Sequence, residues 1–315
     1  MCAVIALDSP ILLRRLALAS VIANVGIVVT GGAVRLTGSG LGCPTWPTCT
    51  DASYVPTSEM GVHGVVEFTN RTLTFVLAAI AIAAFVVALR QRPRRRRVVR
   101  LSVLAGLGLP AQAVVGGLTV LSDLNPWVVG LHFLASIAVI TATYAFWRAT
   151  YESDEPPVVT VAGPLWTLVR LVGVASLAVI VVGVMATGSG PHAGDEDAKR
   201  NGLDPEAISQ VHADLVFALL GLVIATWLAL RAAGAPLAAD RALRLLGISL
   251  AQGLIGLVQY FTHLPVVLVG AHMAGSVAVW LFTLALIHAT HVRPAGPEDS
   301  HDLGVRAAVA DRSTV

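Results

Sequence analysis

Long apolar segments recur along this chain and leave few folds open to it. Each segment is about 20 residues long, which is the length that a helix needs to cross a bilayer. Because 56% of the residues are hydrophobic and only 13% are charged, a water-soluble fold would lack the polar surface to cover them. The sequence therefore predicts an all-α integral membrane protein with eight transmembrane helices, at residues 11–34, 64–89, 98–120, 126–148, 164–186, 207–230, 241–260 and 264–290.

The basic residues lie unevenly on the two sides of this arrangement. Of the 21 Lys and Arg residues, all but Arg35, Arg71, Lys199 and Arg200 fall on one side. Since cytoplasmic loops carry the excess of Lys and Arg, both chain termini are predicted in the cytoplasm. The arginine run at 94–97 could bind nucleic acid, but beside a membrane span it is better interpreted as an anchor facing anionic lipid. The first apolar run is too long for a cleaved signal peptide, so we expect it to stay as the first helix.

An internal repeat divides the chain into two halves. Residues 112–116 (QAVVG) recur as 252–256 (QGLIG), and residues 130–136 (GLHFLAS) recur as 270–276 (GAHMAGS), both with an offset of 140 residues. Four helices are an even number, so the halves should share one orientation and be related by an axis along the membrane normal. We predict two pseudo-twofold-related four-helix bundles. The parts are an N-terminal half at 1–150, a C-terminal half at 151–292 and a disordered cytoplasmic tail at 293–315.

The repeat shows which histidines occupy equivalent positions in the two halves. His132 and His272 occupy equivalent places on the fourth and eighth spans, and the position equivalent to His212 on the sixth span is Asn70 on the second. One histidine inside a span is usually a packed or hydrogen-bonding residue, but repeated ones are harder to explain in that way. These histidines and His63 lie within about 15 Å of the outer helix ends. Facing imidazoles on paired helices favour heme iron over zinc, because zinc prefers a tighter cluster with thiolates or carboxylates.

Glu67 and the two outer cysteines are the remaining candidates. Glu67 lies four residues after His63 and three before Asn70, so the three share a helix face. It is either a polar residue at the outer interface or a proton acceptor and donor for chemistry in a cavity. Cys43 and Cys49 share the first outer loop, where an oxidising compartment favours a disulfide that is either structural or redox-active.

Three outer motifs resemble those of the heme A synthase family. They are residues 31–49 (GGAVRLTGSGLGCPTWPTC), 67–71 (EFTNR) and 187–195 (TGSGPHAGD), and the likeness extends over all eight predicted spans. The cysteine pair resembles the subgroup that carries it in the first outer loop. The resemblance implies oxidation of the C8 methyl group of heme O to the formyl group of heme A, through two hydroxylations and a dehydration, with water as the oxygen source. It also implies a bacterial-type plasma membrane, with heme sites toward the outer face.

The resemblance further implies cofactors, partners and roles for individual residues. Heme b would be held by His212 and His272, and the substrate heme O would lie near His132. Glu67 would be the catalytic acid or base. The implied partners are a farnesyltransferase that makes heme O, a terminal oxidase that receives heme A, and the lipid membrane; a homo-oligomer stays open. No nucleic acid is expected.

The remaining site residues are His63, Asn70, Arg35, Arg71, Cys43 and Cys49. Many family members have a histidine where Asn70 stands, and His63 is the nearest substitute, about 10 Å closer to the outside. Arg35 and Arg71, as outer basic residues, are expected to contact heme propionates or to anchor helix ends. Cys43 and Cys49 are candidates for a redox role.

Two other functions explain part of the pattern. A diheme membrane cytochrome that only transfers electrons would use the histidines but would leave Glu67 and the cysteine pair without a role. A repeat-built transporter would bind its solute near the membrane midplane, whereas the polar residues here gather toward the outer side. A reduced-minus-oxidised spectrum separates these classes.

Overall fold

The computed structural model describes residues 8–294 and forms eight long helices. All eight are long and apolar enough to cross a membrane, which confirms the predicted all-α membrane fold. Cys2 and residues 295–315, most of the predicted cytoplasmic tail, lie outside the described residues. The helices are α1 (Pro10–Leu36), α2 (Gly61–Arg90), α3 (Arg96–Leu121), α4 (Pro126–Ala149), α5 (Gly163–Ser189), α6 (Pro205–Ala232), α7 (Pro236–Phe261) and α8 (Val266–Ala289). The 3-10 helix Ser58–Met60 precedes α2, and the short strands β1 (Val158–Val159) and β2 (His291–Val292) pair antiparallel.

Local signals in the sequence explain where several helices begin. The side chains of Ser9, Asn125 and Asp204 accept hydrogen bonds from backbone N–H groups in the first turns of α1, α4 and α6. Each of these caps is followed directly by a proline, whose missing N–H costs nothing at the first helical position. The chain therefore enters these helices at defined residues.

The sharp turns after α3 and α7 have the same backbone conformation. Asp123 and Leu124 have φ angles of 53° and 53°, and His263 and Leu264 have φ angles of 60° and 59°. Left-handed conformations are uncommon for residues other than glycine, and these two pairs are separated by the same 140 residues as the repeated motifs. The repeat read from the sequence is therefore also a repeat of backbone structure.

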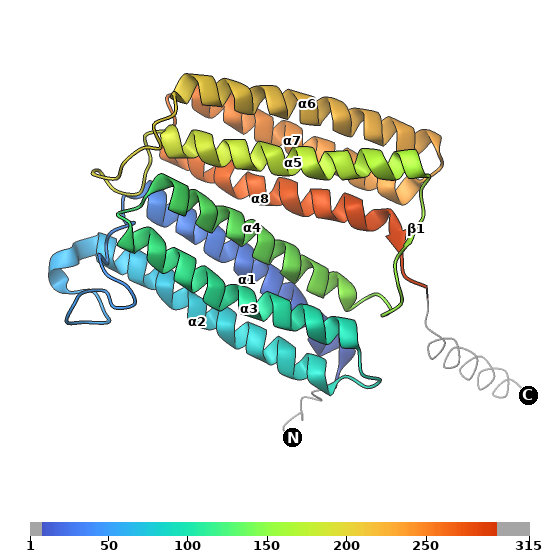
Figure 1. Ribbon diagram of the computed structural model, residues 1–315, viewed down its shortest axis with the longest axis horizontal. Helices are drawn as coiled ribbons and strands as arrows, with labels where there is room; N and C mark the ends of the chain where they lie inside the picture. The colour runs from blue at the N-terminus through green and yellow to red at the C-terminus, as the bar shows by residue number, and fades with distance from the viewer. Residues whose placement is uncertain (1–7, 295–315) are drawn as a thin grey trace, which may run out of the picture.

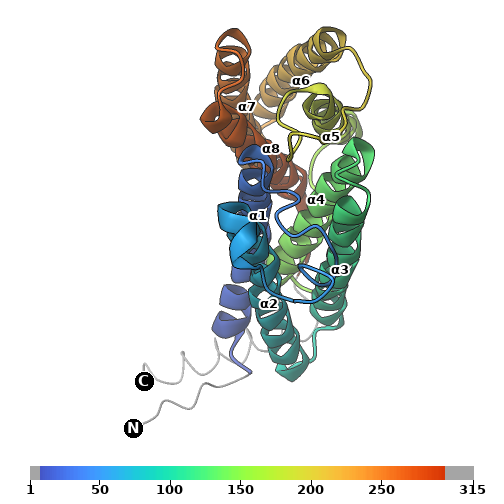
Figure 2. The same ribbon diagram turned by 90° about the vertical axis from the view of Figure 1, so that its left-hand side faces the viewer.

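The helices form two four-helix bundles, α1–α4 and α5–α8, as predicted (Figures 1 and 2). The bundles meet where α8 lies against α1 and α4, and where α4 lies against α5. A cluster around Ile140, Val277 and Trp280 fills this junction, and Trp280 donates a hydrogen bond of 2.8 Å from Nε1 to Thr141. The described chain is thus one assembly with a continuous apolar junction between its halves.

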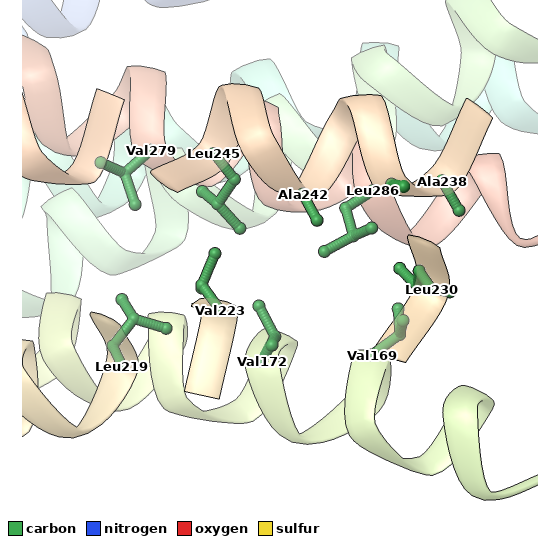
Figure 3. Close-up of a cluster of buried hydrophobic side chains, with 11 residues drawn as sticks. Val169, Val172, Leu219, Val223, Leu230, Ala238, Ala242, Leu245, Val279 and Leu286 are labelled. Atoms are coloured by element: carbon green, nitrogen blue, oxygen red, sulfur yellow. The ribbon is translucent and has the colours of Figure 1, made fainter. Parts of the chain in front are cut away.

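The interior of the C-terminal bundle is built from small and branched apolar side chains. Val172 of α5, Val223 of α6 and Leu245 of α7 are fully buried and point toward one another (Figure 3). The outward faces carry large apolar side chains instead, since Phe75 and Phe217 are 75% and 72% exposed. Such faces are suited to lipid, where apolar side chains carry no hydration cost.

The segment between α4 and β1 lies at the end of the molecule opposite the loop between α1 and α2, which is the first outer loop of the predicted topology (Figure 1). Glu152 of this segment connects several helix ends. Its carboxylate accepts a hydrogen bond of 2.9 Å from Arg97 and lies 3.5 Å from Arg148 and Arg293 and 3.8 Å from His288. Burial by itself would raise the pKa of this carboxyl, but the nearby His288 and the hydrogen bond and positive charge of Arg97 hold the pKa at about 2. The ionised carboxylate therefore joins the start of α3 to the ends of α4 and α8.

Replacing this carboxylate should destabilise the fold in a pH-dependent way. The folded pKa of Glu152 lies below its ordinary value of 4.5, so its contribution is present above pH 4.5 and is lost as the pH falls toward 2. We expect Glu152→Gln to lower the unfolding free energy by roughly 2–3 kcal/mol at neutral pH, since it leaves several cations without their partner. Thermal unfolding in detergent over a pH series should show the gap to wild type closing in acid.

Asp240→Asn is the matched control, because the Asp240–Arg244 pair is exposed and should contribute within about 0.5 kcal/mol. Equal effects of Glu152→Gln and Asp240→Asn would contradict the central role of Glu152.

Candidate functional site

Three histidines pack against glycines on the neighbouring helix. A Cβ atom added at each of these glycines would lie 3.2, 2.9 and 2.9 Å from the imidazole Cε1 atom, so a larger side chain would displace the ring. We call a glycine together with the polar side chain that packs on it from the next helix a seat. The three seats are Gly116 with His132, Gly183 with His212, and Gly256 with His272.

One nitrogen of each ring in these seats has no hydrogen-bond partner within the described residues. The Nδ1 atoms of His132, His212 and His272 are buried, and none has a hydrogen-bond partner among residues 8–294. A buried polar atom without a partner costs about 1–3 kcal/mol. Three such atoms in equivalent positions are hard to explain as packing alone, and they favour rings arranged to bind a ligand.

His212 and His272 face each other across the interior of the C-terminal bundle. Their ring centroids are 6.3 Å apart, with an angle of 76° between the ring planes. Bonds from a metal to imidazole nitrogen are about 2 Å long, so rings on opposite sides of one metal ion have centroids roughly 6 Å apart. The pair therefore fits a heme iron ligated by two histidines.

Two glutamines brace the helices that carry these rings. The Gln252 side chain donates a 2.6 Å hydrogen bond to the carbonyl oxygen of His272, and Gln112 donates at 2.6 Å to the hydroxyl of Ser136, one turn after His132. The Oε1 atoms of both glutamines are buried and unpaired within the described chain. Sequence reasoning found these residues only as parts of the repeat. The repeated spacing of glutamine and glycine, four residues apart on α3 and α7, was the available signal for their role.

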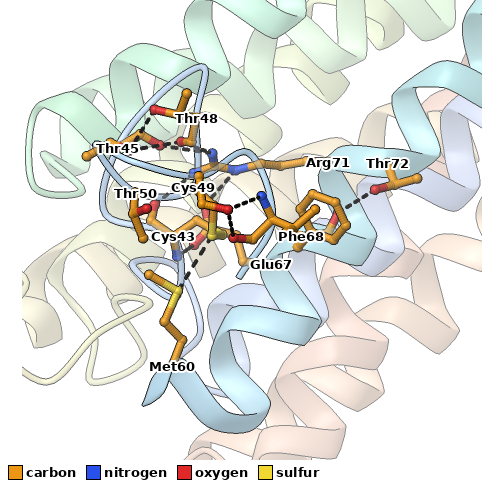
Figure 4. Close-up of a disulfide and its surroundings, with 12 residues drawn as sticks. Cys43, Thr45, Thr48, Cys49, Thr50, Met60, Glu67, Phe68, Arg71 and Thr72 are labelled. Atoms are coloured by element: carbon orange, nitrogen blue, oxygen red, sulfur yellow. Dashed lines mark hydrogen bonds and ion pairs between the residues drawn. A yellow bond between two sulfur atoms is a disulfide. The ribbon is translucent and has the colours of Figure 1, made fainter. Parts of the chain in front are cut away.

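Glu67 is held by the first outer loop rather than lying free (Figure 4). It is only 5% exposed, and its Oε2 atom accepts a 2.6 Å hydrogen bond from the backbone N–H of Cys43. Its Oε1 atom accepts a 3.0 Å bond from Nε of Arg71, one helical turn later. The carboxylate is therefore paired and oriented near the start of α2.

Arg71 also fixes the shape of that loop. Its guanidinium donates to the carbonyl oxygens of Cys43 at 2.8 Å, Thr45 at 2.9 Å and Thr48 at 3.2 Å. Cys43 and Cys49 are fully buried and form the predicted disulfide, with their Cα atoms 4.4 Å apart. The seven residues from Cys43 to Cys49 thus make a closed ring around one guanidinium.

This disulfide ring lies beside the His132 seat. The indole of Trp46 lies so close to Gly117 that a Cβ there would be 2.4 Å from it. Gly117 directly follows Gly116, the glycine against which His132 packs. The outer loop therefore places the paired Glu67 and the single imidazole of His132 around the same end of the N-terminal bundle.

The other predicted residues of α2 have separate partners. His63 is exposed, and its Nδ1 forms a 2.9 Å hydrogen bond with the hydroxyl of Ser39. The Asn70 Oδ1 atom accepts a 2.7 Å hydrogen bond from Thr30 on α1. Although His63, Glu67 and Asn70 share one helix face, their side chains do not form one site. Each hydrogen-bonds to a different residue outside α2.

Arg35 connects the two halves at the end of the molecule where α1 and α5 finish. Its Nε donates at 2.7 Å to the carbonyl of His192, and its NH2 group donates at 3.1 Å to the carbonyl of Thr187. The predicted contacts of Arg35 and Arg71 with heme propionates stay predictions. In the structure both guanidinium groups have protein partners that the sequence did not indicate.

Comparison with known proteins agrees with this arrangement. Residues 14–284 match the family model described as cytochrome oxidase assembly protein. The chain belongs to this family. It is 31% identical over 144 residues to a heme A synthase of Lysinibacillus sphaericus, covering 45% of this chain and 46% of that protein. It is 30% identical over 131 residues to a heme A synthase of Listeria welshimeri, covering 41% and 43% of the two chains.

A heme A synthase of Bacillus cereus is 28% identical over 131 residues, covering 41% of this chain and 42% of that protein. In each alignment the chain spans less than half the length of the curated relative. The family match and these names confirm the resemblance that the outer motifs indicated.

Arg71→Gln tests whether the pairing of Glu67 supports the fold. We expect a loss of about 3–5 kcal/mol in unfolding free energy, because the substitution leaves a buried carboxylate without its cation. The double variant with Glu67→Gln should recover part of this loss. Unfolding of the purified chain in detergent measures the coupling. Arg90→Gln, at the exposed opposite end of the same helix, is the control, and strictly additive effects would contradict the pairing.

Proposed function

We propose that this chain is a heme A synthase, which oxidises the C8 methyl group of heme O to a formyl group and so makes heme A for a terminal oxidase. The observation that carries the proposal is the asymmetry between the halves. The C-terminal half has two facing imidazoles. The N-terminal half has one imidazole in a seat, and the loop that packs on the helix of that seat holds a buried carboxylate and a disulfide ring. One half is suited to a permanent cofactor and the other to a substrate.

The cofactor in this proposal is heme b, ligated by His212 and His272 in the C-terminal half at 151–292. The spacing of their rings and the glycines behind them support this assignment. When bound, heme b supplies a carrier for the electrons removed from the substrate. The N-terminal half at 1–150 binds heme O near His132.

Glu67 is the proposed catalytic acid or base. Oxidation of a methyl group through hydroxylated stages releases protons together with electrons, and a positioned carboxylate can accept them. The N–H of Cys43 and the guanidinium of Arg71 hold this carboxylate in one orientation. The disulfide ring shapes the loop around Glu67, and a redox role for Cys43 and Cys49 belongs to the same proposal.

The orientation in the membrane is also proposed. The loops after α1 and α5 lie at one end of the molecule, and the segment between α4 and α5 lies at the other, near the arginines around Glu152 (Figure 1). Under the positive-inside rule the arginine-rich end faces the cytoplasm. We infer a bacterial-type plasma membrane, cytoplasmic termini and outer heme sites. A farnesyltransferase that supplies heme O and the oxidase that receives heme A are the proposed partners.

A diheme cytochrome that only transfers electrons is the alternative. Its two sites would each be expected to offer two strong ligands, as the C-terminal half does. The N-terminal half instead has Asn70 where its counterpart has His212. The buried, paired carboxylate of Glu67 in this half has no role in simple electron transfer, which supports the enzyme over the cytochrome.

The heme b assignment predicts different effects for two glycines of α7. Gly256→Ala should displace the His272 ring, since the added Cβ would lie 2.9 Å from its Cε1 atom. We expect loss of the low-spin heme spectrum and of heme content, as for His272→Ala. Gly253→Ala is the control, because nothing lies within 4 Å of its Cβ position, and alanine should stabilise the helix by up to about 1 kcal/mol. An unchanged spectrum in both His272→Ala and Gly256→Ala would refute the assignment.

Glu67→Gln distinguishes an enzyme from a cytochrome. The amide keeps the shape of the side chain but cannot accept a proton at neutral pH. We expect the variant to keep its fold and heme b spectrum while heme A formation falls and heme O or a hydroxylated intermediate accumulates. Pigment extracted from cells that express the variant measures this ratio. Wild-type ratios would exclude the catalytic role, and loss of all heme would indicate a packing role.

A further inference from the structure

A fourth seat is present in the molecule, but it holds no imidazole. Asn70 of α2 lies against Gly31 of α1, with its Nδ2 atom 3.9 Å from the Cβ position of the glycine. In the C-terminal half, His212 of α6 packs more closely on Gly183 of α5, with its Cε1 atom 2.9 Å from the Cβ position. Each odd-numbered helix therefore supplies a glycine, and the next helix supplies the polar side chain packed on it.

The side-chain oxygen of Asn70, the one atom of this amide that could ligate a metal, already accepts a hydrogen bond. Oδ1 of Asn70 accepts the hydrogen bond from the hydroxyl of Thr30 at 2.7 Å. The amide nitrogen donates hydrogen bonds and does not offer a lone pair. The residue before the seat glycine is Thr30 in this half and Val182 in the other, so the hydroxyl that holds the amide belongs to this seat alone.

His63 does not fill the gap. It lies seven residues before Asn70, about 10 Å closer to the outer end of the helix. Its side chain is exposed and its Nδ1 is hydrogen-bonded to Ser39. In the C-terminal half the equivalent seat holds a histidine, and the ring of His212 faces that of His272 with 6.3 Å between the centroids.

We propose that the N-terminal half binds its heme through His132 alone, and that the Asn70 seat keeps the opposite side of the iron open for a small ligand such as water. This inference rests on the proposed function and specifies how its substrate is held. The Asn70 oxygen is occupied by the hydrogen bond from Thr30, and the N–H groups of Nδ2 are the donors that the seat can offer to a small molecule. The C-terminal half, with both seats filled, has no such position.

Carbon monoxide is the probe for an open position. The purified full chain in detergent is loaded with added hemin, reduced, and titrated with carbon monoxide while optical spectra are recorded. The oxidised form is examined by electron paramagnetic resonance. We expect the wild type to contain a low-spin heme that ignores carbon monoxide and a high-spin heme that binds it. In Asn70→His the second heme should become low-spin and lose carbon monoxide binding.

Two further variants keep the test sharp if Asn70→His folds poorly. Thr30→Val releases the Asn70 oxygen without adding volume, and it should perturb the high-spin spectrum while the low-spin signal stays unchanged. Val182→Thr with His212→Asn rebuilds the open seat in the other half, and it should create a second heme that binds carbon monoxide.

The inference would be overturned by a wild-type N-terminal heme that is low-spin and inert to carbon monoxide, by absence of a second heme after loading, or by an unchanged spectrum in Asn70→His. Heme A formation is not read in this experiment. A chain that binds carbon monoxide as expected but forms no heme A would keep this inference and refute the proposed activity.

Discussion

Within the hydrocarbon core of a bilayer, every backbone N–H and C=O group must find its partner in the protein. Eight helices satisfy this requirement locally, and each needs only apolar faces to be stable beside lipid. Polar side chains inside such helices carry a cost that soluble proteins avoid. The histidines and Asn70 of the glycine seats, and Glu67 beneath the loop between α1 and α2, are therefore informative.

The glycine seats show how two bundles with one plan can differ in function. Glycine lets the neighbouring helix and its imidazole approach closely, and the same approach is used in three seats. In the fourth, Asn70 stands where the other half has His212, and its side-chain oxygen accepts a hydrogen bond from Thr30. Under the proposed function, this difference lets one half hold a heme permanently while the heme of the other half stays accessible.

The loop between α1 and α2 supplies hydrogen-bond partners for the charged side chains of Glu67 and Arg71 on α2. A closed ring around Arg71 presents three carbonyl oxygens and one N–H group toward the end of α2, where the buried carboxylate of Glu67 needs both charge and hydrogen bonds. The disulfide limits the conformations that this ring could otherwise adopt. Trp46 extends the same ring to α3, so the loop connects the carboxylate to the helix behind His132.

The sequence by itself determined the eight spans, the two related halves and the equivalence of His132 with His272. These features follow from local hydropathy and from spacing along the chain. The structure contains the eight helices and the two bundles. The sequence also indicated the disulfide, because Cys43 and Cys49 share one short loop. The sequence did not show that Arg71 and Arg35 bind backbone carbonyls, or that Thr30 holds Asn70. Those partners lie up to 157 residues apart, and only the packing of helices and loops decides which polar groups meet.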